Sequence, residues 1–476
     1  MSVDRESLRE NAKYLQNVRP VDPEEIYEYL PGQPHPAVVR EALREESFGL
    51  GLREQDDGTF VPVEAAPAPT PGWEPTAFPE RYDRALEGVL LDQFGREWAT
   101  GDSGYTLRER IRELKENYYR GQTADYDEVA ASAYAVYHGA DFYAATGYAL
   151  DPLAERGLLP RRLRVLDVGA GTGGPALALH DYLPEDAIVD YHAVEPSANA
   201  DVLAELLGET DRNFRPTIHR TTAEAFDPGT VGTVDLLVFG NVLSELATPA
   251  ATVRRYCETL AADGTCLLLA PADLETATGL REVERTVTDG GELGVYAPTL
   301  RLWDGDQPAD DGWSFDERGS LEPPATQDRL AAAAEPDEFP DRADLDPAQF
   351  RNTSVRFAYA LLRRDGERRL PVRASASRHA RLAESDDHVT NRVNCLVVKL
   401  SRNLADGGNP VYRVGDGSQT VDHYAVSTRE SVLNTALADA PYGAVLSVEN
   451  VLVLWNDDEE AYNLVCDAET VVDLVG

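Results

Sequence analysis

The sequence predicts an α/β protein in which a doubly wound sheet follows an N-terminal helical module and precedes a C-terminal all-β barrel. Three observations support this prediction. An apolar strand that begins near Leu163 runs into a glycine-rich turn, and the continuous apolar run 234–239 is typical of a strand buried on both faces. From residue 391 onward, short strand patterns alternate with turn residues. A chain of 476 residues is longer than one hydrophobic core usually supports, so several domains are expected.

The composition is strongly acidic and poor in lysine. Asp and Glu number 84 and Lys and Arg 44, which gives a formal net charge of −40. Such a surface is typical of a high-salt cytoplasm, where hydrated carboxylates keep a protein in solution, so we expect a halophilic, cytoplasmic protein. The four cysteines show no Cys-x-x-Cys spacing, and neither disulfides nor a metal site are expected. No apolar run is long enough to cross a bilayer, and no membrane partner is expected.

Residues 1–64 are predicted to form a small N-terminal domain. Helical patterns over 4–17, from Asp22 and over 36–47 precede two short strands that meet at a turn. Three helices followed by such a hairpin resemble a winged-helix domain. Modules of this kind contact nucleic acid about as often as they contact a protein or another domain. A linker rich in Pro, Ala and Thr follows over 65–79.

Residues 80–150 are predicted to be entirely helical. The stretch 130–148 contains the aromatic residues Tyr134, Tyr137, Phe142, Tyr143 and Tyr148. We interpret them as the packing face of a helical lid on the central domain, with stacking on nucleobases as the alternative.

The segment 164–173 carries the strongest chemical signal in the chain. Its strand ends at Asp167, and the pattern Gly-x-Gly-x-Gly that follows lets the backbone pass close beneath a ligand. A second strand, 188–194, ends at Glu195, at a distance from Asp167 that suits an acid for two ribose hydroxyls. The spacing indicates a nucleotide-cofactor site, and the alternative is a strand–helix turn whose site has been lost.

The motif Asp167-Val-Gly-Ala-Gly-Thr-Gly173 resembles motif I of the class I S-adenosylmethionine-dependent methyltransferases. This resemblance implies the doubly wound sheet of that class over 151–367 and S-adenosyl-L-methionine as the cofactor. The residues predicted to bind it are Asp167, Gly169, Ala170, Gly171, Gly173, Glu195, Pro196, Glu224 and Asn241.

The segment after the strand 234–239 supplies the candidate catalytic residues, Asn241 and Glu245. With Ser244, they stand where ligands meet the carboxyl ends of the strands, or they cap a helix that starts there. The usual Asn/Asp-Pro-Pro-aromatic sequence is missing, no lysine occurs between residues 163 and 364, and both cysteines of this domain fall in apolar patterns. Cofactor binding is therefore better supported than any particular target chemistry.

Six short segments extend the resemblance to one family. They are 194–197, 241–246, 279–285, 296–298, 313–315 and 356–364. Together they resemble the small-ribosomal-subunit methyltransferase-like family, the assembly factors of mitochondrial ribosomes and their bacterial and archaeal relatives. The resemblance implies, as partners, small-subunit ribosomal RNA or its precursor particle, with ribosomal proteins. Members commonly hold an iron–sulfur cluster through cysteines. Because Thr299 and Ser314 stand at those positions here, no cluster is expected, and the loop 299–350 must be held otherwise or be mobile.

A second linker, 368–390, leads to the C-terminal domain, 391–476. Five strand patterns, with a helix over 428–438 between the third and the fourth, are typical of an oligonucleotide/oligosaccharide-binding barrel. The pattern resembles the single-stranded-DNA-binding-protein type of that fold. The predicted nucleic-acid-binding residues are Lys399, Tyr412, Arg413 and Tyr424. Core packing is the alternative for these positions, and protein docking is the alternative for the barrel.

Three functions are consistent with these features. The first is a methyltransferase acting on ribosomal RNA, in which catalysis is mostly proximity because the sulfonium of the cofactor is already activated. The second is a non-catalytic assembly factor that uses bound S-adenosylmethionine structurally. The third, a small-molecule methyltransferase, would not need the two flanking modules.

Overall fold

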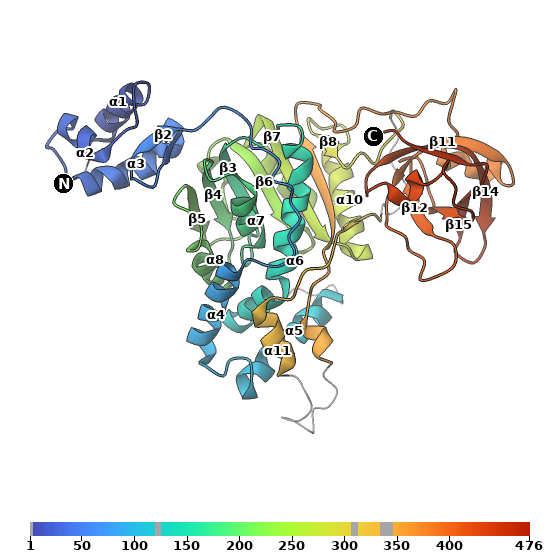
Figure 1. The fold of residues 1–476 in the computed structure, drawn as a ribbon, viewed down its shortest axis with the longest axis horizontal. Coiled ribbons are helices and arrows are strands. Elements are labelled where there is room, and N and C mark those ends of the chain that lie inside the picture. Colours follow the sequence, from blue (N-terminus) through green and yellow to red (C-terminus); the bar gives the residue numbers. More distant parts are fainter. Residues whose placement is uncertain (1–2, 120–124, 306–312, 334–345) are drawn as a thin grey trace. The chain divides into compact units, whose positions relative to one another are not determined.

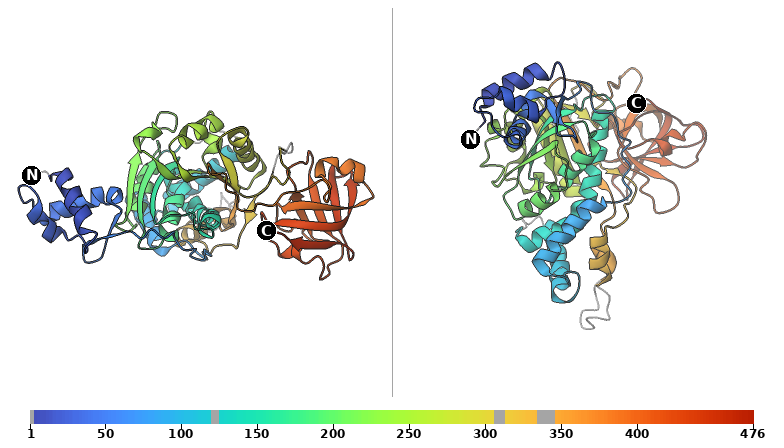
Figure 2. Two further views of the ribbon diagram at one scale, coloured as in Figure 1. Left: turned by 90° about the horizontal axis from the view of Figure 1, so that it is seen from above. Right: turned by 60° about the vertical axis from the view of Figure 1, so that its left-hand side comes forward.

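The computed structural model describes residues 3–119, 125–305, 313–333 and 346–476 (Figures 1 and 2). The chain divides into two compact units. One unit comprises 1–236 with 321–353, and the other comprises 237–320 with 354–476. Part of the loop 299–350 lies outside the described residues. None of the helices in the described ranges has the length and apolar character needed to cross a membrane.

The N-terminal module has the helices and the hairpin that the sequence predicts. The Asp4 carboxylate begins the first helix by accepting hydrogen bonds from two backbone amides, and Gly51 ends the third with a positive φ of 67°. The winged-helix assignment stays a prediction. The elements are α1 (Arg5–Leu15), α2 (Pro23–Ile26), η1 (Tyr27–Tyr29), α3 (Pro36–Leu50), β1 (Leu52–Glu54) and β2 (Phe60–Pro62), with β1 and β2 antiparallel.

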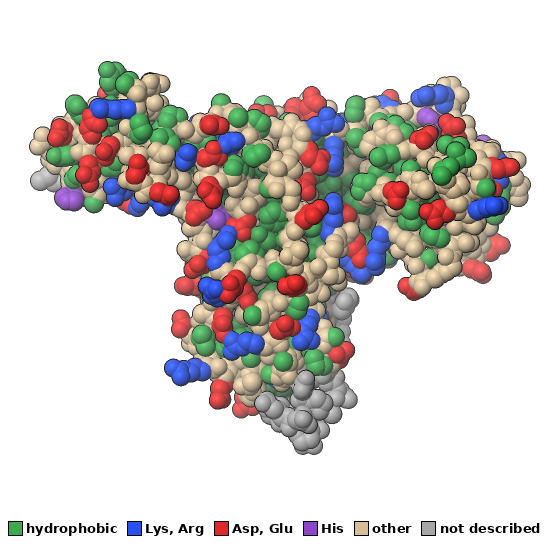
Figure 3. Space-filling view, in the orientation of Figure 1, with side chains coloured by type: hydrophobic (Ala, Val, Ile, Leu, Met, Phe, Trp, Pro, Cys, Tyr) green, Lys and Arg blue, Asp and Glu red, His purple; other side chains and the backbone are tan. Residues whose placement is uncertain are grey.

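Ion pairs within the module neutralise much of its basic charge. On α3, Arg44 donates from Nε to Glu54 Oε2 at 2.6 Å and also pairs with Glu41. Acidic and basic side chains are interspersed on the face of the module drawn in Figure 3.

The module attaches to the amino ends of the first sheet strands. Glu54 and Asn213 exchange two hydrogen bonds, of 2.8 Å and 3.0 Å, through their backbone and side-chain amide groups. The guanidinium groups of Arg162 and Arg164 lie 4.9 Å and 4.8 Å from the ring centre of Phe48. These contacts are at the opposite ends of the strands from the glycine-rich turn.

The sheet has the strand order β5-β4-β3-β6-β7-β10-β8, with β9 beside β10. β3, β4 and β5 are parallel, whereas β10 is antiparallel to both β7 and β8, so the sheet is mixed. The strands are β3 (Arg162–Val168), β4 (Ile188–Val194), β5 (Phe214–His219), β6 (Val234–Gly240), β7 (Leu260–Pro271), β8 (Gly294–Ala297), β9 (Asp316–Glu317) and β10 (Arg356–Arg363). The doubly wound α/β prediction is thus confirmed in its first strands, and the antiparallel strand is an addition to it.

Helices of the first unit pack against one another and along the sheet. The long helix α6 lies along α7 (Figure 1). Tyr143 and Tyr148 on α6 are buried, as the lid interpretation requires. Thr326 of α11 donates to Asp83 of α4 at 2.5 Å. The helices are α4 (Glu80–Phe94), α5 (Gly101–Tyr119), α6 (Glu128–Ala154), α7 (Gly174–Tyr182), α8 (Asn199–Leu207) and α11 (Ala325–Ala332).

In the second unit, a buried ion pair lies on the helix α10 (Leu274–Thr288), which follows α9 (Pro249–Cys257). Arg281 donates to Glu284 at 2.6 Å, and each residue is 2% exposed. Arg281 also donates to the Tyr442 hydroxyl at 3.1 Å, and that hydroxyl lies 3.1 Å from Ser314 Oγ. Because Tyr442 belongs to the C-terminal domain, this network fastens that domain to α10.

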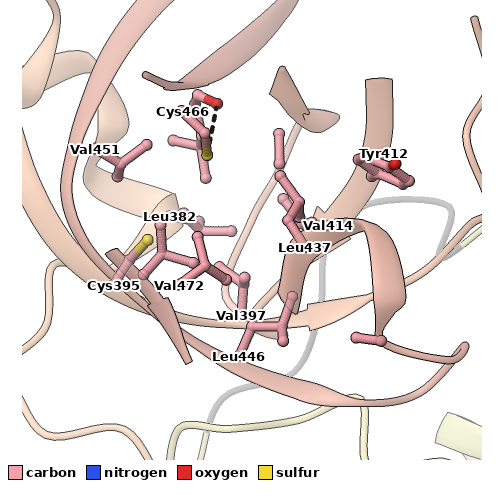
Figure 4. Close-up of a cluster of buried hydrophobic side chains, with 14 of the residues drawn as sticks. Leu382, Cys395, Val397, Tyr412, Val414, Leu437, Leu446, Val451, Cys466 and Val472 are labelled. Carbon is pink, nitrogen blue, oxygen red and sulfur yellow. Dashed lines mark hydrogen bonds between the residues drawn. The ribbon is translucent and has the colours of Figure 1, made fainter. Parts of the chain in front are cut away.

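The C-terminal domain is a closed five-stranded barrel. The strands follow the order β11-β12-β13-β15-β14, β14 pairs again with β11, and β13 and β15 are parallel. Its core is apolar, and Cys395 and Cys466 lie among the core side chains (Figure 4). The elements are η6 (Leu382–His388), β11 (Arg392–Lys399), β12 (Val411–Gly415), β13 (His423–Ser427), α12 (Ala436–Asp439), β14 (Val445–Asn456), β15 (Ala461–Cys466) and β16 (Val471–Leu474).

Two element predictions for this domain are corrected. The helix predicted over 428–438 is confined to α12, since Asn434 bonds the backbone of its own loop at Arg429 and of Asp467. The strand β16, which pairs with β14, was not expected.

Candidate functional site

The glycine-rich turn between β3 and α7 needs three residues without side chains. Gly169, Gly171 and Gly173 have φ angles of 68°, 55° and 99°, which other residues rarely adopt. A Cβ atom on Gly173 would lie 2.7 Å from the side chain of Leu203. The turn is therefore held close to its neighbours, with backbone rather than side chains facing the space above it.

Gly173→Ala is expected to reduce the free energy of unfolding by about 1–3 kcal/mol, because it adds both backbone strain and a clash with Leu203. Thermal unfolding of the full chain measures this. Gly72 has a similarly positive φ of 70°, but a Cβ atom placed on it would meet nothing within 4 Å, so Gly72→Ala serves as the control for strain alone. Equal losses in the two variants would contradict the tight packing of the turn.

Asp167 lies at the end of β3 and is fully buried. Tyr191 of β4 donates its hydroxyl hydrogen bond to Asp167 Oδ2 at 2.5 Å, whereas Oδ1 has no partner. Burial raises the pKa of Asp167 from 3.8 to about 7, the charge of Glu195 adds to that effect, and the Tyr191 hydrogen bond opposes it. A buried carboxylate oxygen without a partner is costly, and it is ready to accept from a ligand.

Glu195, at the end of β4, binds the glycine-rich turn directly. Its Oε2 accepts a hydrogen bond from Gly171 N at 2.9 Å, and its Oε1 accepts from Ser197 N and Ser197 Oγ at 3.0 Å and 2.5 Å. A carboxylate oxygen can accept two hydrogen bonds, so Oε2 retains room for a ligand hydroxyl. The structure thus brings together Asp167, the three glycines and Glu195, which are spread along the sequence from the end of one strand to the end of the next.

An aromatic face of α6 covers the turn. Tyr134 lies 3.8 Å from a Cβ built on Gly171, and Phe142 lies 2.9 Å from one built on Gly174. His138, between them on the same helix face, stacks on Phe142 with ring centres 4.7 Å apart. Sequence reasoning missed His138 and Tyr191. The spacing of four residues between Tyr134, His138 and Phe142 is the signal that could have found the histidine.

The other predicted cofactor residues differ in their surroundings. Ala170 is buried and donates its backbone N–H to Val194 O, whereas Pro196 and Glu224 are exposed in the turns after β4 and β5. Their contacts with a cofactor stay predictions.

Asn241 and Glu245 follow β6 in the second unit. Asn241 has a φ of 60° and donates its backbone N–H to Leu269 O at 3.0 Å. The predicted helix is only the short turn η3 (Leu243–Glu245), which has no side-chain cap, so the capping alternative is wrong for this turn. Their catalytic role stays a prediction.

Three of the four residues predicted to bind nucleic acid are buried within the barrel. Lys399 Nζ donates to the carbonyl oxygens of Ala438 and Ala440 at 3.0 Å and 2.7 Å, and burial lowers its pKa to about 8. Tyr412, under the Lys399 ammonium, belongs to the core, as the alternative interpretation held.

Arg413 is buried, pairs with Asp422 and lies over the Trp313 ring. Tyr424 is half-exposed and donates to Asp422 at 3.2 Å. Phosphate and base contacts through Lys399, Tyr412 and Arg413 are therefore not available on this surface, because carbonyl, carboxylate and aromatic groups of the protein already occupy these side chains.

Lys399→Ala is expected to destabilise the barrel by about 1–3 kcal/mol, since two buried carbonyl acceptors lose their donor. Thermal unfolding measures the loss, and Lys13→Ala, at an exposed position, is the control. A variant that unfolds like the wild type but loses affinity for oligonucleotides would contradict the structural role.

Three family models match parts of the chain, and one of them matches the central segment. Residues 166–266 match a family model described as a methyltransferase domain. Residues 5–56 and 383–475 match the N-terminal and C-terminal domain models of a domain of unknown function, DUF8157. No curated protein matches the chain.

Several solved structures are similar to parts of the chain. The plantazolicin methyltransferase BpumL in complex with SAH is 11% identical, covers 60% of this chain and 97% of its own, and has a TM-score of 0.29. The sugar N-methyltransferase KedS8 from Streptoalloteichus is 22% identical, with coverages of 32% and 52% and a TM-score of 0.21. The precorrin-6y C5,15-methyltransferase from Geobacter metallireducens is 18% identical, with coverages of 32% and 70% and a TM-score of 0.25. TM-scores this low give no information about the substrate of this protein.

The central domain is an S-adenosylmethionine-dependent methyltransferase domain, and S-adenosylmethionine is its cofactor. The residues of the first unit fit that molecule. Asp167 Oδ1 offers a free acceptor for a cationic group, Glu195 offers one for a hydroxyl, and the glycine turn leaves room for a ligand against its backbone.

Proposed function

We propose that this protein is an S-adenosylmethionine-dependent methyltransferase that acts on or with small-subunit ribosomal RNA during assembly of the subunit. The observation that carries the enzymatic part is the free, buried Oδ1 of Asp167 beside the glycine turn. The ribosomal part is supported by the sequence segments that resemble the small-ribosomal-subunit methyltransferase-like family.

The bound cofactor supplies an activated methyl group, and the chain holds it in place. Asp167 and Glu195 would accept hydrogen bonds from it, and the turn between β3 and α7 would face it with backbone rather than side chains. The aromatic face of α6 limits how an acceptor approaches. Rate acceleration would come chiefly from proximity, with Asn241 and Glu245 proposed to position the acceptor atom.

The flanking modules support a macromolecular acceptor. The N-terminal helices and hairpin are consistent with the predicted winged-helix module. The closed barrel, with its parallel pair β13–β15 and α12 between β13 and β14, supports the oligonucleotide/oligosaccharide-binding type. Both modules serve nucleic-acid or protein partners in other proteins.

The second candidate is a non-catalytic assembly factor that keeps bound S-adenosylmethionine for stability. It is favoured by the sequence of the loop after β6, which lacks the Asn/Asp-Pro-Pro-aromatic motif that orients an exocyclic amine.

The test is to purify the tagged protein from its own cells, sequence the co-purifying RNA and map methylated nucleotides with and without the gene. Enriched small-subunit RNA that loses one methyl group in the deletion and in an Asp167→Asn strain establishes the enzyme. Enrichment with no lost methyl group supports the assembly factor. Absence of ribosomal RNA overturns the ribosomal part, and a small-molecule acceptor becomes the better explanation.

A further inference from the structure

One end of the barrel displays a ladder of aromatic rings that reaches the surface. Trp455 on β14 is 40% exposed and pairs in register with Tyr462 on β15. Their ring centres are 4.8 Å apart at 65°, and Tyr462 in turn stacks on the buried His423 of β13 at 5.0 Å. The ladder therefore has a rigid base, and its outermost member is an indole.

Hydrogen bonds hold the first and the last ring of the ladder, the Trp455 indole and the His423 imidazole. Trp455 Nε1 donates to Asp457 Oδ1 at 2.9 Å. His423 Nε2 lies 2.8 Å from Ser385 Oγ on η6, and His423 Nδ1 lies 2.9 Å from Val421 O. The ring faces are thus held in place before any partner arrives, which reduces the entropy cost of binding.

Two acidic segments flank this ladder. The hairpin turn between β14 and β15 is Asp457-Asp458-Glu459-Glu460, and η6 contributes Glu384, Asp386 and Asp387, all of them exposed. Among the residues that the structure describes, none of these seven carboxylates forms an ion pair. Three arginines of the barrel pair elsewhere: Arg392 with Asp467, Arg402 with Glu317 and Arg413 with Asp422.

The carboxylates lie near the rings. Ser385 contacts His423 directly, so its neighbour Asp386 lies beside the ladder, where its charge contributes to raising the pKa of Tyr462, after burial. On the other side, Asp457 accepts the hydrogen bond of Trp455 Nε1, so the turn 457–460 begins beside the outermost ring.

We propose that the surface formed by Trp455, Tyr462, the turn 457–460 and residues 384–387 docks a cationic polypeptide segment rich in arginine. A guanidinium group stacks on an indole face and is attracted to its π electrons, and carboxylates around the ring neutralise the remaining positive charge. Single-stranded RNA could use the same rings for base stacking, but seven carboxylates without ion-pair partners would repel its phosphates. The charge of the surface thus selects the peptide. The proposal concerns the barrel alone and stands whether or not ribosomal RNA is the methyl acceptor.

The test uses the full chain and a fluorescein-labelled octa-arginine peptide, with fluorescence anisotropy at low and at molar potassium chloride. We expect Trp455→Ala to weaken binding about fivefold or more, and Trp455→Phe to weaken it less, because a ring remains. The variant D457N/D458N/E459Q/E460Q should lose affinity further and show a weaker dependence on salt.

The matched control is Asp406→Asn with Asp473→Asn, two exposed carboxylates of the barrel that lie outside the acidic segments; it should bind like the wild type. Equal binding by the wild type, Trp455→Ala and the quadruple variant would overturn the proposal. So would oligouridine that displaces the peptide and itself loses affinity in Trp455→Ala, which would assign the surface to RNA. If Trp455→Ala lowers the melting temperature, Trp455→Phe and the quadruple variant decide the question.

Discussion

Asp167→Asn should weaken S-adenosylmethionine binding about 30- to 100-fold and, at the same time, make the cofactor-free protein more stable above neutral pH. The cofactor carries positive charge, and hydrogen bonds to a charged acceptor contribute roughly twice as much as neutral ones. Asn keeps the shape of the side chain and can still accept from Tyr191, so the variant removes mainly the charge.

The gain in stability follows from the direction of the pKa shift. Burial raises the pKa of Asp167 from 3.8 to about 7. Below pH 3.8 the carboxyl is protonated in both the folded and the unfolded protein. Between 3.8 and about 7 the unfolded chain releases this proton and the folded chain keeps it, so stability falls as pH rises. Above about pH 7 the loss of unfolding free energy is at most about 4 kcal/mol, and the Asn variant would not have this loss.

Isothermal titration at pH 6 and pH 8 measures the affinity, and thermal unfolding measures the stability. Wild-type affinity should rise with pH as Asp167 ionises, and that rise should disappear in the variant. Asp190→Asn on the neighbouring strand is the control, and it should lower the stability rather than raise it. Its partners His192 and Arg164 hold the pKa of that carboxyl below its usual value. A variant that binds the cofactor normally would remove Asp167 from the site.

Glu284→Ala should cost about 3–5 kcal/mol of stability in the second unit. The substitution leaves the guanidinium of Arg281 buried without its counter-ion, and breaking such a pair costs more than the pair itself contributes. The double variant R281M/E284L should recover most of the loss, because two apolar side chains remove the unpaired charge.

Thermal and denaturant unfolding of the full chain test this prediction. Glu80→Ala, which breaks the exposed pair with Arg84, is the matched control and should change nothing measurable. If the single variant is as mild as this control, water reaches the Arg281–Glu284 pair and the Tyr442 network does not fasten the barrel. If the double variant is as unstable as the single one, packing rather than charge determines the loss.

The cofactor turn could be predicted from the sequence because its requirements are local. Three glycines at positive φ and an acid at each strand end are visible as residue types at fixed spacing. Tyr191 could not be found in this way, since the contact that supports Asp167 crosses from one strand to the next.

The barrel shows the opposite limit. Its five strands were predicted correctly because each has its own apolar pattern. Most of the side chains that were expected on its surface are instead buried. Lys399 is buried because the carbonyl groups at 438 and 440 happen to face it, and that arrangement depends on a loop far away in the sequence. Trp455 was overlooked because an exposed tryptophan looks like a core residue in the sequence.

The attachment of the N-terminal module sets a minimum length for any molecule that would use both the module and the cofactor turn. Phe48 and Glu54 meet the sheet where β3 and β5 begin, and the turn lies where β3 ends. A strand of seven residues at about 3.3 Å each separates these points by roughly 20 Å. A metabolite the size of a sugar cannot bridge that distance, whereas a folded RNA or a protein can, so only a molecule of that size could contact the module and the turn at once.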